Sequence, residues 1–99
     1  MQVDIKSIHF KADRKLEDFI KEKVEKLSQF FDGVISAEVT LKLDNNEGTD
    51  NKISEIRLSI PGNYLYAKKQ SKSFEESTDS AAEALRKQLL KYKAKIRRN

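Results

Sequence analysis

The stretch Ile35–Leu43, ISAEVTLKL, decides the fold because its apolar and polar residues alternate strictly. The apolar positions are Ile35, Ala37, Val39, Leu41 and Leu43, and the polar positions between them are Ser36, Glu38, Thr40 and Lys42. Successive side chains of a β-strand point to opposite faces, so the pattern predicts a strand with one buried and one solvated face. The sheet that contains this strand should therefore be covered on one side only.

The chain after this strand predicts two more strands. Residues 44–50 (DNNEGTD) are of types that favour turns. In the third strand Ile56, Leu58 and Ile60 should face inward and Glu55, Arg57 and Ser59 outward, and Pro61-Gly62 should end it. Residues 64–69 then predict a fourth strand, which forms a hairpin with the third and has Leu65 and Ala67 inward.

The chain before residue 35 predicts a short strand and a helix. Val3 and Ile5 alternate with polar residues, which is typical of a strand. A helical stripe follows at three- and four-residue spacing, made of Leu16, Phe19, Ile20, Val24, Leu27 and Phe31. Asp13 is the expected N-cap and Gly33 the expected C-terminal stop of this helix.

A second helix is predicted from Phe74 to about residue 97, because Ser73 and Glu76 have the spacing of a capping box. Its apolar stripe, expected to pack on the sheet, contains Phe74, Thr78, Ala81, Ala82, Leu85, Leu89, Tyr92 and Ile96. The element order is β-α-β-β-β-α. The predicted fold class is α+β, a two-layer sandwich in which both helices pack on one face of a four-stranded sheet.

Length and composition predict one domain over residues 1–99. The chain has no cysteine, which excludes disulfides and thiolate metal sites. It has no apolar run of signal-peptide or membrane-spanning character, so we expect a cytoplasmic protein without a membrane partner. The single histidine, His9, is expected to be an edge or turn residue, and the isolated glycines form no phosphate-binding loop. We therefore expect no enzyme activity, no metal and no cofactor.

Charge is distributed unevenly along the chain. Residues 86–99 carry seven basic side chains and no acidic one, whereas the net charge of the whole chain is +4, so residues 1–85 sum to −3. Such a concentration of positive charge favours binding to a polyanion, most commonly a phosphate backbone. Acidic residues early and basic residues late in a helix also complement the helix dipole, but the dipole acts only over the terminal turns. The basic residues extend over more than three turns.

Three segments resemble the short ribosome hibernation promoting factors, also called ribosome-associated inhibitors, S30EA-type proteins or the sigma-54 modulation protein family. They are LEDFIKEKVEKLSQFFD (Leu16–Asp32), AEVTLKL (Ala37–Leu43) and STDSAAEALRKQLLKYKAKIRR (Ser77–Arg98). The resemblance covers essentially the whole chain. The sequence departs from the family pattern at Ser73-Phe74-Glu75, where the family commonly has an Asp followed by an apolar and an aromatic residue.

The resemblance implies binding to the small ribosomal subunit and its rRNA, in the channel for mRNA and tRNA, with inhibition of translation in stationary phase or under stress. The RNA-binding residues that the resemblance implies are Lys23, Lys26, Lys87, Lys91, Lys93 and Lys95. Arg86 is basic and lies beside the motif, so we include it among the expected RNA-binding residues. We expect no C-terminal ribosome-dimerisation domain. Short members that support ribosome dimers act alongside a second small factor, and we expect a monomer off the ribosome.

The residues alone leave other interpretations open. A general double-stranded-RNA-binding domain and a regulator that binds an acidic protein partner are both compatible with a basic helix on a sheet. Lys23 and Lys26 have acidic neighbours, and by pattern alone they belong to a solvated helix face. Tyr64 and Tyr66 could stack on bases, although paired tyrosines on strands more often serve packing.

Overall fold

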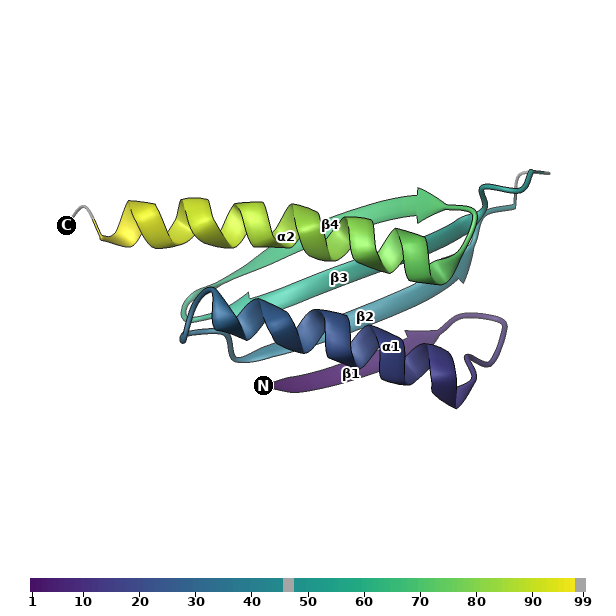
Figure 1. Ribbon diagram of the computed structural model, residues 1–99, viewed down its shortest axis with the longest axis horizontal. Coiled ribbons are helices and arrows are strands. Elements are labelled where there is room, and N and C mark those ends of the chain that lie inside the picture. The colour runs from purple at the N-terminus through teal and green to yellow at the C-terminus, as the bar shows by residue number, and fades with distance from the viewer. Residues whose placement is uncertain (46–47, 98–99) are drawn as a thin grey trace.

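The computed structural model describes residues 1–45 and 48–97 and has the predicted element order (Figure 1). The elements are β1 (Gln2–Ser7), α1 (Arg14–Glu25), the 3-10 helix η1 (Lys26–Gln29), β2 (Ser36–Leu43), β3 (Lys52–Ile60), β4 (Asn63–Ser71) and α2 (Phe74–Ile96). The sheet order is β1-β2-β3-β4, in which β1 and β2 are parallel and the other pairs antiparallel. Arg98 and part of the predicted 44–50 turn lie outside the described residues.

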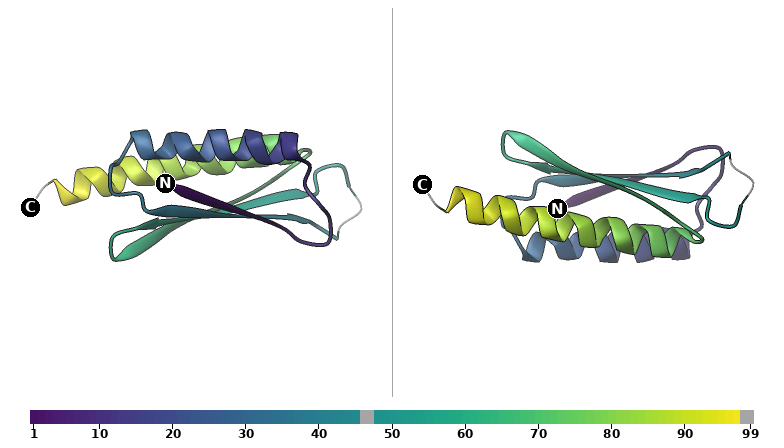
Figure 2. Two further views of the ribbon diagram at one scale, coloured as in Figure 1. Left: turned by 90° about the horizontal axis from the view of Figure 1, so that it is seen from below. Right: turned by 90° about the horizontal axis from the view of Figure 1, so that it is seen from above.

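Both helices lie on the same side of the sheet, as Figure 2 shows in two views. Between the layers lies one core, to which α1, the two central strands β2 and β3, and α2 contribute fully buried side chains. The largest of them are Ile20, Leu41, Ile56, Leu58, Ile60, Leu85 and Leu89. The predicted α+β sandwich with one covered face is therefore confirmed.

Both helices begin where the sequence predicts. The carboxylate of Asp13 accepts a hydrogen bond from the Leu16 amide at 2.8 Å. The hydroxyl of Ser73 accepts one from the Glu76 amide at 3.1 Å. Each bond satisfies one of the amides that a helix N-terminus leaves without an intrahelical partner.

The predicted stop of the first helix at Gly33 is wrong. The α-helix ends at Glu25 and continues only as the 3-10 turn to Gln29, in which the Ser28 hydroxyl donates to the Glu25 carbonyl at 2.8 Å. Gly33 has a different role, because a Cβ at this position would lie 2.5 Å from the ring of Phe31. A glycine is needed here for the close approach of that ring.

The apolar stripes are less completely buried at their ends than predicted. Ile35 is 58% exposed, Leu43 45% and Ile96 42%. All three stand at the end of an apolar stripe, beyond the part that the opposite layer covers. The C-terminal part of α2 extends past the sheet, which explains Ile96 (Figure 1). The inward placement predicted for Ile35 and the burial predicted for Ile96 are corrected accordingly.

A buried polar contact joins α2 to the sheet. Ser54 of β3, Ser77 and Thr78 are completely buried. The Ser54 hydroxyl lies 2.7 Å from that of Ser77 and 3.0 Å from that of Thr78, and Ser77 also donates to the Phe74 carbonyl at 3.3 Å. These hydrogen bonds require α2 to sit at one register on β3, since any shift would leave a buried hydroxyl without a partner.

We predict that Ser54→Ala destabilises the fold by about 1–3 kcal/mol, because it removes a partner from the buried Thr78 hydroxyl. Urea unfolding followed by circular dichroism would measure the change. Ser80→Ala is the matched control, since Ser80 is an exposed serine of α2. It should shift the free energy of unfolding by no more than about 0.5 kcal/mol. Equal stability of Ser54→Ala and the wild type would contradict the assigned role of the hydroxyl contact.

Candidate nucleic-acid interface

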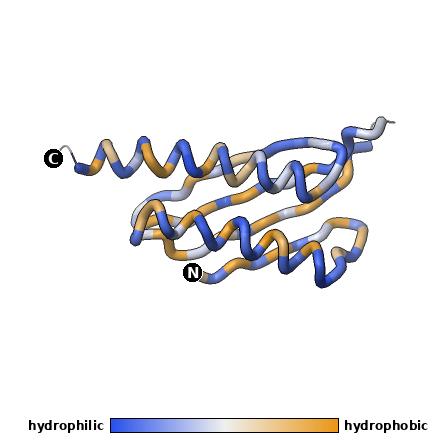
Figure 3. Tube along the Cα trace, viewed as in Figure 1, coloured by the Kyte–Doolittle hydropathy of each residue, from blue (hydrophilic) through white to orange (hydrophobic). Residues whose placement is uncertain are grey.

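The C-terminal half of α2 carries most of the predicted RNA-binding residues. Its hydrophilic positions recur along the helix to the last described turn (Figure 3). Leu89 is the last fully buried residue of α2, so the turns that follow are largely free of the core. Lys87, Lys91 and Lys95 are exposed, and Lys93 is half-buried. In the part of the chain that the structure describes, none of these four lysines makes an ion pair.

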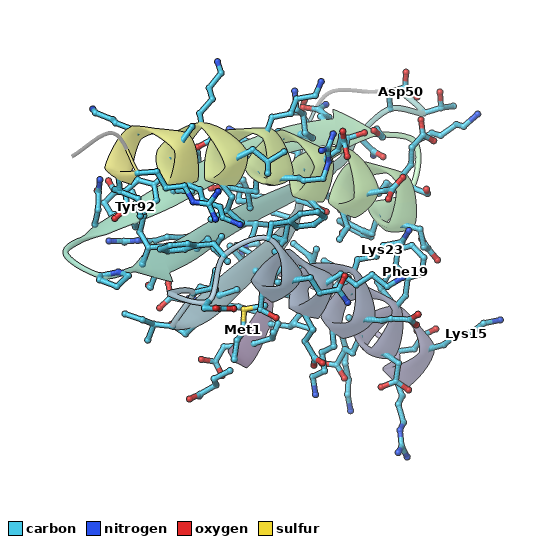
Figure 4. All side chains as sticks on the ribbon, turned by 60° about the vertical axis from the view of Figure 1, so that its left-hand side comes forward. Met1, Lys15, Phe19, Lys23, Asp50 and Tyr92 are labelled. Atoms are coloured by element: carbon cyan, nitrogen blue, oxygen red, sulfur yellow. The ribbon has the colours of Figure 1, made fainter. Side chains whose placement is uncertain are left out.

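The other three predicted residues meet in one groove between the helices. Lys23 of α1, Lys26 of η1 and Arg86 of α2 line a groove of about 160 Å³, together with Asp79 and Glu83. Figure 4 shows Lys23 beside Phe19 between the two helices, with Lys15 extending away. The structure therefore brings Arg86 close to two lysines that precede it by sixty or more positions in the sequence.

All three cations in this groove are paired with carboxylates. Lys23 Nζ lies 3.2 Å from Asp79 Oδ1, and it is also 5.6 Å from the centre of the Phe19 ring. Lys26 lies 3.8 Å from a carboxylate oxygen of Glu22, one turn earlier. Phosphate contact by any of them would have to replace an existing ion pair, which separates them from the four unpaired lysines of α2.

The ion pair between Arg86 and Glu83 within α2 is bidentate. Arg86 Nε donates to Glu83 Oε2 at 3.0 Å, and Arg86 Nη2 donates to Glu83 Oε1. These hydrogen bonds lower the pKa of Glu83 and raise the pKa of Arg86. A forked guanidinium–carboxylate contact holds the arginine in one geometry.

The lysines of α2 do not share one face. Lys93 and Arg97 line a groove of about 240 Å³ with Phe30 and Phe31 of the α1 side. Lys87 instead lines a groove of about 560 Å³ on the β4 side, with Lys69. Basic side chains thus lie on more than one side of the C-terminal half of α2. Lys69 was not predicted as a site residue, because only the packing of α2 beside β4 places it near Lys87.

The opposite, uncovered face of the sheet carries a second group of interacting side chains. The Tyr66 hydroxyl donates to Glu55 Oε1 at 2.6 Å, and Lys42 forms an ion pair with the same carboxylate. The contact with Lys42, followed by that with Tyr66, lowers the pKa of Glu55. The bond to Glu55 raises the pKa of Tyr66 to about 12. Nearby, Arg57 Cζ lies 4.0 Å from the centre of the Tyr64 ring.

Residues 1–45 and 48–97 contain no group of three or more His, Cys, Asp or Glu residues arranged to hold a metal. No helix among them is both long and apolar enough to cross a membrane. His9 is exposed and adopts a left-handed backbone conformation with φ 65° just after β1, as expected for a turn residue.

Residues 3–97 match the family described as sigma 54 modulation protein / S30EA ribosomal protein. The chain belongs to this family. A curated member, the ribosome hibernation promoting factor of Pseudomonas putida, is 30% identical over 95 residues, which cover 96% of this chain and 89% of that protein. The ribosome hibernation promoting factor of Klebsiella oxytoca is 25% identical over 99 residues, covering all of both chains.

Solved structures support the same fold for this S30EA-family chain. A ribosomal subunit interface protein from Coxiella burnetii superimposes with a TM-score of 0.84 at 19% identity, covering 95% of this chain and 99% of that chain. At this identity the similarity concerns the fold alone. The four-stranded sheet with two helices on one face is thus the fold of a structurally characterised protein.

We predict that Glu55→Gln lowers the pKa of Tyr66 from about 12 towards its usual value near 10. The carboxylate stabilises the protonated phenol, so its contribution to stability is complete below pH 10 and is lost as the pH rises through about 12. A tyrosinate absorbance titration, compared with Tyr66→Phe to assign the signal, would measure this. Circular dichroism at each pH would establish that the chain is folded.

Glu38→Gln is the matched control. Glu38 is an exposed carboxylate of β2 on the same face, and the carboxylate that accepts the hydrogen bond of Tyr66 is that of Glu55. It should leave the titration of Tyr66 unchanged. An identical shift in both variants would mean that general charge on this face, rather than the hydrogen bond, controls the phenol.

Proposed function

We propose that this protein is a ribosome hibernation factor. It binds the small ribosomal subunit in the mRNA and tRNA channel, through basic residues of its helices, and inhibits translation by occupying that channel without a catalytic step. Residues 1–99 act as a single ribosome-binding domain. The observation that carries the proposal is the group of unpaired lysines on the C-terminal half of α2, in a chain whose family includes named ribosome hibernation factors.

The charge arrangement suits structured RNA. Lysines neutralise phosphates as point charges and release bound counterions, a contribution that is independent of sequence. Side chains cannot read the deep major groove of A-form RNA, so proteins recognise it largely by shape and backbone. A narrow helix with basic side chains around its circumference can approach phosphates on more than one side at once. A pocket for one small ligand would require a concave apolar surface instead.

The ion pairs divide the predicted RNA-binding residues into two classes. Lys87, Lys91, Lys93 and Lys95 can bind phosphate without losing an intramolecular partner. Lys23, Lys26 and Arg86 must exchange a carboxylate for a phosphate, so their net contribution is smaller. They retain a positioning value, because the carboxylates of Asp79, Glu22 and Glu83 hold Lys23, Lys26 and Arg86, respectively, at the groove between the helices.

We predict that Lys87→Glu/Lys91→Glu/Lys95→Glu abolishes co-sedimentation with isolated small ribosomal subunits, because it replaces phosphate attraction with repulsion. For the wild type, with about five neutralised phosphates, the logarithm of affinity should fall with the logarithm of salt concentration with a slope of about −3 to −5. Sedimentation over a salt series measures both effects. Binding that is insensitive to salt would contradict the phosphate-contact mechanism.

Lys11→Glu/Lys15→Glu/Lys21→Glu is the control with the same change in net charge. These three exposed lysines lie in or before α1 rather than on the C-terminal half of α2. This variant should weaken binding far less than the α2 variant. If both variants lose binding equally, net charge rather than the α2 surface accounts for the interaction.

We also predict that Asp79→Asn strengthens binding to the subunit by a factor of about 1.4 to 5, because it frees Lys23 from an ion pair of typical surface strength. Asp18→Asn provides the comparison, since it removes an equal charge from an ion pair with Arg14 within α1. Competition sedimentation against the wild type would measure the difference. Weaker binding of Asp79→Asn would show that Asp79 supports the interface rather than competing with it.

A further inference from the structure

The uncovered face of the sheet is not used by the proposed function. It lies on the side opposite the helices (Figure 2). Two tyrosines of β4 stand on it, and they are not packed into the core, since Tyr64 is 50% exposed and Tyr66 44%. Packing in the core, the usual role of neighbouring tyrosines on a strand, therefore does not account for these two residues.

Both tyrosines are nevertheless held in place. Arg57 lies over the Tyr64 ring, with its Cζ 4.0 Å from the ring centre. Tyr66 is fixed at its hydroxyl by Glu55, which Lys42 holds in turn. An exposed aromatic ring that is already ordered loses little conformational entropy when a ligand stacks on it.

The charge around the rings favours an anion. The side chains next to them on this half of the face include the cations Lys42, Arg57 and Lys68 and the carboxylates Glu38 and Glu55, so cations are in excess. Glu55 is already engaged by Lys42 and Tyr66. An apolar protein partner would bury these charged groups without replacing their hydration, at considerable cost.

The spacing of the rings selects for a particular form of nucleic acid. Tyr64 and Tyr66 are two residues apart on one strand, which corresponds to about 6.8 Å at ~3.4 Å per residue. Bases in a stacked helical strand rise by about 3.4 Å. Adjacent bases can therefore reach both rings only if they are unstacked from each other, which excludes a regular duplex.

We propose that this face is a second RNA-binding site, where unpaired nucleotides stack on the Tyr64–Arg57 pair and on Tyr66 while Lys68 contacts phosphate. Aromatic rings and guanidinium planes are common stacking surfaces for single-stranded RNA. That the natural ligand is ribosomal RNA rests on the proposed function. The stacking site itself does not, and it can be tested with free oligonucleotides.

The test uses a labelled oligouridylate of about eight nucleotides, within the usual site size of a single-stranded-RNA-binding domain, and a duplex RNA of equal length. Fluorescence anisotropy should show tighter binding of the full chain to the single strand. Tyr64→Leu/Tyr66→Leu should weaken single-strand binding by about tenfold or more. Tyr64→Phe/Tyr66→Phe keeps both rings and should retain most of the affinity.

Intrinsic fluorescence gives a second measurement, since the chain has three tyrosines and no tryptophan. Stacked bases should quench the wild-type signal. No binding of oligouridylate by the wild type, or equal binding by the Leu and wild-type chains, would overturn the inference. Sedimentation with small subunits is run in parallel. If subunit binding fails while oligouridylate binding depends on the rings, the proposed function is wrong and the stacking site stands.

Discussion

Burial of only one face of the sheet is the constraint on which the rest of the structure depends. Because apolar and polar residues alternate along β2 and along residues 55–60 of β3, both helices must share that face, and the Ser54–Ser77–Thr78 contact places α2 at one register. From that register the last fully buried residue of α2 is Leu89, seven residues before the helix ends at Ile96. About 10 Å of helix therefore projects, at ~1.5 Å per residue. Because this part of the helix contributes few side chains to the core, its positions can be occupied by charged residues.

The same helix separates its charges along its length, with consequences beyond the helix dipole. The acidic first half lies beside α1, where Asp79 pairs with Lys23, so intramolecular ion pairs neutralise the groove between the helices. The projecting part itself contains no acidic residue, and its Lys91, Lys93 and Lys95 make no ion pair with any residue that the structure describes. A polyanion would consequently meet its strongest attraction at one end of an elongated molecule of 48 × 23 × 18 Å. The sequence of α2 thus determines both the attraction to a polyanion and the end of the molecule that would face it.

Periodicity and caps predicted the element order, both N-caps and the single buried face, because these features depend on local sequence. The helix stop at Gly33 was wrong because close approach of the Phe31 ring, a packing effect, also requires glycine. Exposure of Ile35 and Ile96 depends on where the opposite layer ends, which no local pattern records. The division of the predicted cations into paired and unpaired groups likewise depends on contacts such as Lys23–Asp79, between elements distant in sequence. Family resemblance could supply residue identities but not these partners.

The two basic surfaces constrain the shape of any RNA that binds both. The α2 lysines belong to the helical layer, whereas Tyr64, Tyr66 and Lys68 lie on the far side of the sheet. A straight duplex can contact only one side of a body whose smallest dimension is 18 Å. RNA that contacts both must surround the protein, presenting phosphates on one wall and unpaired bases on the other. A channel lined with folded RNA would meet that requirement and an isolated RNA helix would not, so the two proposals together are compatible with a large RNA assembly and not with a free duplex.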